Sequence, residues 1–212
     1  MQRAVYSIEG KELRNVELDD GVFGLLVNES VVWYAINNEL ANKRLGTACT
    51  KGRGEIHGSN AKPYKQKGGG RARRGDKKSP LLRGGGTVFG PKPRDYSYSM
   101  PKKAKRLALK SILSLKAQSE TLKIVEDFSV ASGKTKDLVE ILKNFSPEQR
   151  TVIILKDDDP LIKRAGRNIP RLSFLSYNRL QAHDLFYARQ VVALEGAVKN
   201  LNAFYGPQGE AK

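Results

Sequence analysis

The chain has 212 residues, with 38 lysines and arginines against 22 acidic residues, and its formal net charge is +16. Its single cysteine, Cys49, excludes a disulfide framework and a cysteine-based metal cluster. No apolar run approaches the ~20 residues of a membrane span and no signal-peptide apolar region is present, so we expect a soluble cytoplasmic protein.

The N-terminal region predicts a hairpin followed by a helix. Alternating stretches at 3–8 and 13–18 are separated by a Glu-Gly-Lys turn, a pattern typical of paired strands. Asn28 is placed to cap a helix over 29–42. The apolar face of that helix would contain Val32, Ile36 and Leu40.

The segment from Lys43 to Arg106 carries the whole charge excess. It contains 19 lysines and arginines but only three acids, Glu55, Asp76 and Asp95, so its net charge equals that of the entire chain. The remaining residues are balanced. Such concentrated positive charge indicates a polyanionic partner, and we expect that partner to bind here.

The same segment holds 12 of the 20 glycines and shows no helical or strand period. Ordering one backbone residue costs roughly 1–2 kcal/mol, and so little apolar surface cannot offset that cost. We therefore expect the segment to be mobile alone and ordered against its partner. Arginine forks bind phosphate and aromatic rings stack on unpaired bases, so RNA is favoured over a solvated linker. The aromatic residues interleaved with the cations are Tyr64, Phe89, Tyr96 and Tyr98.

A second helix is predicted from Pro101 to Ser119, with an apolar stripe of Ala104, Ala108, Ile112 and Leu115. Cations in its first turns oppose the helix dipole, an arrangement that nearby phosphates would favour. Beyond it, strands and helices alternate. We expect strands at 122–127, 151–155, 172–176 and 190–194, and helices at 135–145, 160–167, 181–187 and 196–204.

This alternation predicts an α/β fold: a three-layer α/β/α domain with a mainly parallel sheet. A long extended basic loop is inserted near the N-terminal third. The predicted division is a globular domain of 1–42 and 101–205, a Gly/Lys/Arg-rich RNA-binding loop of 43–100, and a flexible tail of 206–212.

A nucleotide-using α/β enzyme with a disordered cationic arm is one alternative. Ser132-Gly133-Lys134-Thr135 follows a strand as a phosphate-binding loop would, but the position five before Gly133, where such a loop needs glycine, is Phe128. The glycine clusters of the basic segment complete no dinucleotide-binding pattern. We interpret Ser132 as a helix cap.

Other candidate sites also have simpler interpretations. Asp157–Asp159 could bind Mg²⁺, but Asp159 is better placed to cap a helix beginning at Pro160. His183 adjoins Asp184 without an identified nucleophile, so we expect it to cap or pack. We expect no catalytic residue, metal site or cofactor.

The stretches KPYKQKGGGRARRG (62–75) and RGGGTVFGPKPRDYSYSMPKKAKRLALKS (83–111) resemble the bacterial large-subunit ribosomal protein four family, as do LANKRLGT (40–47) and RNIP (167–170). The resemblance implies a structural, non-catalytic protein that binds large-subunit (23S) rRNA early in assembly and contacts several rRNA domains. It also implies contact with neighbouring large-subunit proteins and with the passing nascent polypeptide. Some family members repress their own messenger RNA, so a free regulatory RNA-binding protein is a second alternative.

By the same resemblance, the loop tip lines the narrow part of the polypeptide exit tunnel. The tip residues are Lys65, Gln66, Lys67, Gly68, Gly69, Gly70 and Arg71. The family usually has tryptophan at Tyr64, threonine at Gly69 and tryptophan near Leu82.

The predicted rRNA-binding residues combine the cations of this segment with two of its tyrosines. They are Lys43, Arg44, Lys51, Arg53, Lys62, Tyr64, Lys65, Lys67, Arg71, Arg73, Arg74, Lys77, Lys78, Arg83, Lys92, Arg94, Tyr96, Lys102, Lys103 and Arg106.

Overall fold

The computed structural model describes residues 1–130, 132–145 and 149–206. Contacts between Cα atoms divide the chain into two units, one of residues 1–42 and 98–212 and the other of Lys43–Ser97. The boundary falls three residues before the predicted one. Tyr98 belongs with the first unit because its N–H donates to Asn42 Oδ1 over 3.0 Å and its ring lies 5.8 Å from that of Tyr34. The predicted tail at 207–212 lies outside the described residues.

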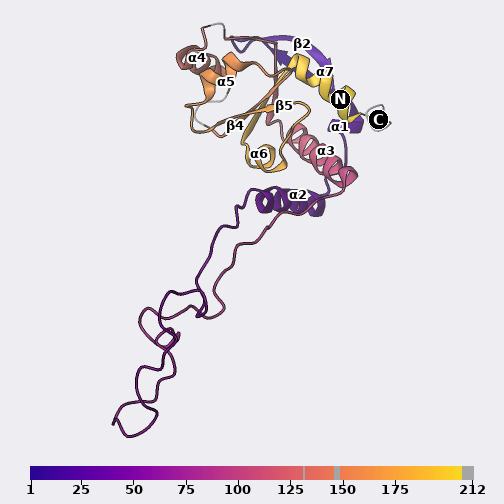
Figure 1. Ribbon diagram of the computed structural model, residues 1–212. Coiled ribbons are helices and arrows are strands. Elements are labelled where there is room, and N and C mark those ends of the chain that lie inside the picture. Colours follow the sequence, from indigo (N-terminus) through magenta and orange to yellow (C-terminus); the bar gives the residue numbers. More distant parts are fainter. Residues whose placement is uncertain (131, 146–148, 207–212) are drawn as a thin grey trace. The chain divides into compact units, whose positions relative to one another are not determined.

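The first unit is an α/β fold built on a six-stranded sheet (Figure 1). The strands are β1 (Gln2–Tyr6), β2 (Glu12–Glu17), β3 (Leu122–Val125), β4 (Thr151–Leu155), β5 (Leu172–Ser176) and β6 (Gln190–Leu194). Their order is β2-β1-β3-β6-β4-β5, and only the β1–β2 hairpin is antiparallel. The expected hairpin and mainly parallel sheet are confirmed.

Seven helices accompany the strands within the described residues. They are α1 (Asp20–Phe23), α2 (Glu29–Asn42), α3 (Lys102–Gln118), α4 (Thr135–Phe145), α5 (Pro160–Gly166), α6 (Ala182–Tyr187) and α7 (Glu195–Tyr205). None of these helices is long and apolar enough to cross a membrane. Each predicted helix is present within a residue or two of its expected bounds, whereas α1 was not predicted.

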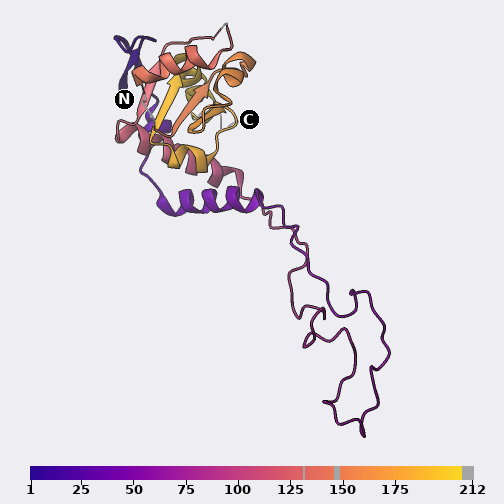
Figure 2. The same cartoon turned by 90° about the vertical axis from the view of Figure 1, so that its left-hand side faces the viewer.

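Helices cover both faces of the sheet. The chain moves outward from β3 through α4 to β4 and through α5 to β5, then returns through α6 to β6, which lies between β3 and β4. Right-handed crossovers place helices on opposite faces when the direction reverses. Accordingly, α4 contacts α5, whereas α6 contacts α2 and α3. Figure 2 shows the strands between these two groups.

The apolar core lies between the sheet and its helices. All five residues of β4 are buried, as expected for a strand covered on both faces. The largest fully buried side chains include Ile112 of α3, Ile153 of β4 and Leu185 of α6. Among the described residues, none from 43–97 belongs to the core or packs against it. The core of the α/β unit is therefore formed without the basic segment.

The N-terminal cap of α2 is as predicted, but its buried face differs at one residue. The Asn28 side chain accepts from the Val31 N–H over 3.2 Å, which confirms the cap of α2. Val32 and Ile36 are buried, but Leu40 is 42% exposed, so its predicted place on the buried face is wrong. Residues turn by about 100° each along a helix, so the buried residues span roughly 160° from Asn38 to Ile36, and Leu40 lies about 40° beyond Ile36, outside this face. The buried face continues instead through Asn38.

Candidate nucleic-acid interface

The cations predicted to bind RNA are available at the surface. Apart from Lys78 and Arg106, which are half-buried, every predicted lysine and arginine is exposed. Those from Lys43 to Arg94 lie in a continuous stretch without helix or strand, between α2 and α3. Lys102, Lys103 and Arg106 instead belong to the first turns of α3, in the α/β unit.

The three acids of the segment are engaged locally. Lys92 Nζ lies 2.6 Å from both carboxylate oxygens of Glu55, and Gly52 N–H donates to the same carboxylate over 2.8 Å. The Lys92 ammonium lowers the pKa of Glu55, and Glu55 raises the pKa of Lys92. One acid thus holds one cation, and most of the positive charge of the segment is left for a partner.

The other two carboxylates shape turns. Asp76 accepts from the Lys78 N–H over 3.0 Å. Asp95 accepts from the Ser97 N–H over 2.8 Å and from the Ser97 hydroxyl over 2.7 Å, and the backbone hydrogen bond lowers the pKa of Asp95. Side chains of this type stabilise turns by bonding backbone two residues ahead. In the contacts described, neither Asp76 nor Asp95 forms an ion pair with a cation of the segment. Both carboxylates therefore serve to order the backbone.

The two ends of the segment meet at Tyr96. The guanidinium carbons of Arg44 and Arg94 lie 3.8 and 4.4 Å from the centroid of the Tyr96 ring, a cation–π arrangement. The Arg94 side chain also donates to the Tyr96 hydroxyl and lowers its pKa. Arg94 N–H donates to the Gly46 carbonyl over 3.2 Å. Two arginine forks are thereby held together within the segment.

Gly46 allows this close approach. Its φ is +63°, and a Cβ at this position would lie 1.9 Å from the Arg94 carbonyl oxygen and 3.2 Å from Tyr96 Cδ2. An L side chain would therefore be strained by its backbone conformation and by contact with Arg94.

The predicted tip residues form a small cluster. Tyr64, Lys65, Lys67, Gly68, Gly69 and Arg71 line one shallow cavity. The Tyr64 hydroxyl donates to the Ala72 carbonyl, and the Arg71 guanidinium lies 6.0 Å from the Tyr64 ring. A Cβ at Gly69 or Gly70 would meet no heavy atom within 4 Å. The backbone around the three glycines is therefore open to close approach by a partner.

Phe89 is not among the rRNA-binding residues predicted from the sequence. Its side chain is fully exposed and its φ is +48°, a conformation that a bulky residue rarely adopts. Its place among the cations was visible in the sequence, but its exposure in a strained conformation was not. An exposed ring held in this way is available for stacking on a base.

The sites considered for other chemistry have structural roles. Asp159 caps α5 by accepting from the Leu161 N–H over 2.8 Å, as predicted. The Ser132 hydroxyl accepts from the Lys134 N–H just before α4. His183 Nδ1 lies 3.1 Å from Asp184 Oδ1, and its ring packs 5.0 Å from that of Tyr187. Over the described part of the chain, no three His, Cys, Asp or Glu residues are grouped to hold a metal ion.

Comparison with known proteins gives matches along almost the whole chain. The family described as "Ribosomal protein L4/L1 family" matches residues 16–204. The chain is 75% identical over 206 residues to the large ribosomal subunit protein uL4 of Treponema denticola, covering 97% of this chain and 98% of that protein. The protein of the same name from Treponema pallidum (strain Nichols) is 67% identical over 212 residues, 100% of this chain and 98% of its own. That from Borrelia duttonii is 56% identical over 207 residues, with 97% and 99% covered.

Proposed function

The chain belongs to the ribosomal protein L4/L1 family, and from that premise we propose that it is a structural component of the large ribosomal subunit and not an enzyme. The relatives named as large ribosomal subunit proteins match nearly their full length and nearly all of this chain. The role therefore applies to the whole chain, including the basic segment.

The basic segment binds large-subunit rRNA. The observation that carries this proposal is the set of exposed lysines and arginines in a stretch whose three acids are engaged locally. Guanidinium and ammonium groups neutralise phosphates and release condensed counterions, which supplies affinity independent of base sequence. Tyr64 and Phe89 add faces on which unpaired bases can stack, whereas the Tyr96 ring is engaged by Arg44 and Arg94 and positions their guanidinium groups.

The segment acts as a long extended loop inserted between α2 and α3. It adopts its bound shape against rRNA, because its own apolar side chains cannot repay the entropy of ordering it. One segment without helix or strand can follow irregular folded RNA, which supports contact with several rRNA domains. A segment that becomes ordered only against rRNA is placed most easily before that RNA has compacted, which supports binding early in assembly. The α/β unit anchors the loop and contacts neighbouring large-subunit proteins.

The tip from Lys65 to Arg71 forms part of the polypeptide exit tunnel wall and touches the nascent polypeptide in passing. Its residues are polar, charged or glycine, so they offer no large apolar group to retain a moving peptide. The exposed, open backbone at Gly69 and Gly70 supports this role.

Sedimentation of cell lysate tests the assignment to the subunit. We expect the chain to migrate with large subunits through moderate salt and to be absent from the light fractions. A chain found mainly in light fractions with messenger RNA would instead identify a free regulatory RNA-binding protein.

Crosslinking from the tip tests the finer placement. A photoreactive group at Lys67 should crosslink to large-subunit rRNA and, in translating ribosomes, to nascent peptide. The same group at Lys136, an exposed residue of α4, is the control and should give no nascent-peptide adduct. Equal adducts from both positions would contradict the tunnel assignment.

A further inference from the structure

Three arginines meet at the amino-terminal edge of the sheet, outside the basic segment. Arg150, Arg171 and Arg189 directly precede residues that the sheet places side by side, because Thr151 of β4 is paired with both Leu172 of β5 and Gln190 of β6. Their backbones are also joined: Thr151 N–H donates to the Arg171 carbonyl, and Arg189 N–H to the Arg150 carbonyl, each over 2.9 Å. The parallel register thus brings together residues far apart in sequence.

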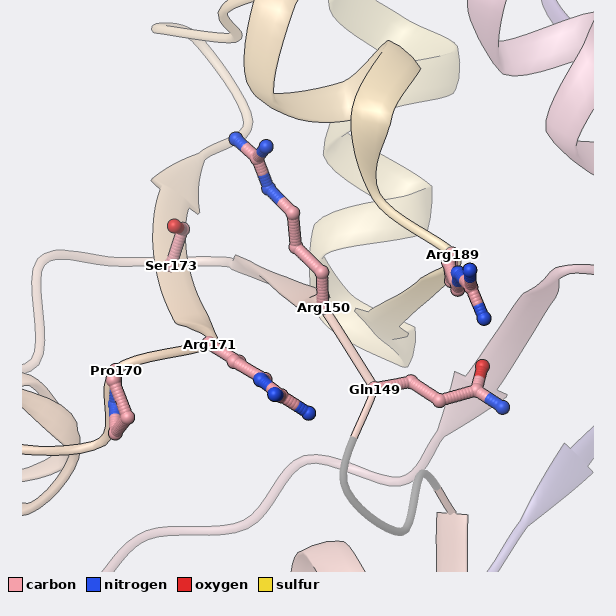
Figure 3. Close-up of a pocket in the computed structure, with 6 residues that line it drawn as sticks. All are labelled: Gln149, Arg150, Pro170, Arg171, Ser173 and Arg189. Atoms are coloured by element: carbon pink, nitrogen blue, oxygen red, sulfur yellow. The ribbon is translucent and has the colours of Figure 1, made fainter.

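These arginines line a cavity of about 540 Å³ together with Gln149, Pro170 and Ser173 (Figure 3). We call this set of six residues the arginine edge. In Figure 3 the Arg171 side chain extends toward Gln149, whereas Arg150 runs away from them. Arg150 Nη2 donates to Asp184 Oδ1 of α6 over 3.3 Å. Arg171 and Arg189 are exposed, and none of the six lining residues is acidic.

The chemistry of the arginine edge suits phosphate. Arg171 and Arg189 lie on the two sides of β4 with their side chains exposed at one cavity, and an anion bound there is attracted by both positive charges. The arginine fork binds phosphate oxygens bidentately, and the amide of Gln149 and the hydroxyl of Ser173 can donate further hydrogen bonds. None of the six residues is aromatic, so a base or nucleoside finds no stacking surface among them. A sugar–phosphate backbone therefore fits better than a nucleotide.

We propose that the arginine edge binds an RNA phosphodiester and gives the α/β unit an rRNA anchor of its own, in addition to the basic segment. The proposal rests on the proposed function, since it takes rRNA to be the partner of the chain. Binding there is independent of base sequence, and Arg171 and Arg189 supply two phosphate contacts.

The test compares full-length variants in rRNA binding. Arg171→Gln with Arg189→Gln removes two charges from the arginine edge. Lys134→Gln with Lys136→Gln removes two charges from exposed positions at the start of α4, which follows the carboxyl end of β3 at the opposite edge of the sheet. Affinity for purified large-subunit rRNA is measured from 50 to 200 mM salt, and thermal unfolding checks that each variant is folded.

Two lost phosphate contacts lower the salt slope by about 1.4–1.8 at 0.7–0.9 per contact. The wild-type-to-variant affinity ratio for the arginine-edge variant should therefore be about 7- to 12-fold greater at 50 mM than at 200 mM salt. The ratio for the α4 control should stay constant. Equal behaviour of both variants, with a steep wild-type slope, would overturn the arginine edge alone, whereas a flat wild-type slope would overturn the proposed function.

Protection of Arg171 and Arg189 from chemical modification in the wild-type chain is a second measurement. It does not depend on the folding of any variant. An arginine-selective dicarbonyl reagent, read by mass spectrometry, should modify Arg171 and Arg189 several-fold more slowly in the rRNA complex. Unchanged modification would contradict the proposal. Inorganic polyphosphate is the competing probe: protection by polyphosphate but not by rRNA would identify a free-anion site and overturn it too.

Discussion

Replacing Gly46 with alanine should weaken rRNA binding by about 10- to 300-fold, by closing off the conformation in which the ends of the basic segment meet. At φ +63°, a Cβ would lie 1.9 Å from the Arg94 carbonyl oxygen. The left-handed conformation costs an L residue roughly 1–2 kcal/mol. Moving the backbone around residue 46 away from Arg94 to relieve the clash also breaks the hydrogen bond from the Arg94 N–H to the Gly46 carbonyl, which is worth about 0.5–1.5 kcal/mol.

Together these costs reach about 1.5–3.5 kcal/mol, and each 1.4 kcal/mol is tenfold in affinity. We expect the segment to populate many conformations when free and the Gly46–Arg94 contact when bound, so most of the cost falls on the bound state. Thermal unfolding should not change, since the core contains no residue of 43–97 among those described.

The assay is titration of purified large-subunit rRNA with wild-type, Gly46→Ala and Gly54→Ala chains at one salt concentration. Gly54→Ala is the matched control, because Gly54 is an exposed residue of the same segment whose Cβ would meet nothing within 4 Å and whose φ is not in the left-handed region. We expect the control to bind within about twofold of wild type, which corresponds to about 0.4 kcal/mol where a tenfold change corresponds to 1.4 kcal/mol. Equal affinity of Gly46→Ala and wild type would refute the reasoning.

Three further predictions concern the Glu55–Lys92 ion pair of the basic segment, the apolar core and the C-terminal helix α7. Because Lys92 lowers the pKa of Glu55 below its usual 4.5, the contribution of their pair is complete above pH 4.5 and is lost as pH falls through the lowered value; carboxyl NMR titration should show this, and Lys92→Met should return the pKa toward 4.5. Ile153→Ala, at a fully buried position of β4, should cost about 2–5 kcal/mol in urea unfolding, against under ~1 kcal/mol for Val139→Ala, which is 37% exposed; similar losses would contradict the placement of the core. Burial raises the pKa of Tyr205 to about 12, so its contribution to stability is complete below pH 10.0 and is lost as pH rises toward 12; urea unfolding should show a weaker decline for Tyr205→Phe, and an equal decline would count against this cause.

Most of the α/β unit could be predicted from the sequence because its signals are local. The continuous apolar run at β4 and the Asp159-Pro160 start of α5 each determine an element without reference to the rest of the chain. By contrast, α1 is a single turn capped by Asp19, whose side chain accepts from the Gly21 N–H over 2.8 Å, and four residues show no period. Leu40 followed the expected spacing, but its helix buries Asn38, whose amide donates to the Tyr98 carbonyl over 2.6 Å.

The arginine edge was beyond sequence reasoning because it depends on strand order. β6 is the last strand in the chain, yet it lies between β3 and β4, and this insertion places Arg189 next to Arg150. Nothing local to Arg150, Arg171 or Arg189 indicates that they are neighbours. The basic segment, in contrast, is visible in composition alone, because its charge is concentrated in one continuous stretch.

The salt dependence of rRNA affinity tests the central claim most directly. Each neutralised phosphate contributes about 0.7–0.9 to the slope of log affinity against log salt. If the exposed cations of residues 43–106 bind the rRNA backbone, the full chain should show a slope steeper than about −6, the value for some seven to nine contacts. Replacing residues 48–95 by a short neutral linker should remove most of that slope while circular dichroism still reports a folded α/β unit. A full-length slope near zero would contradict the account.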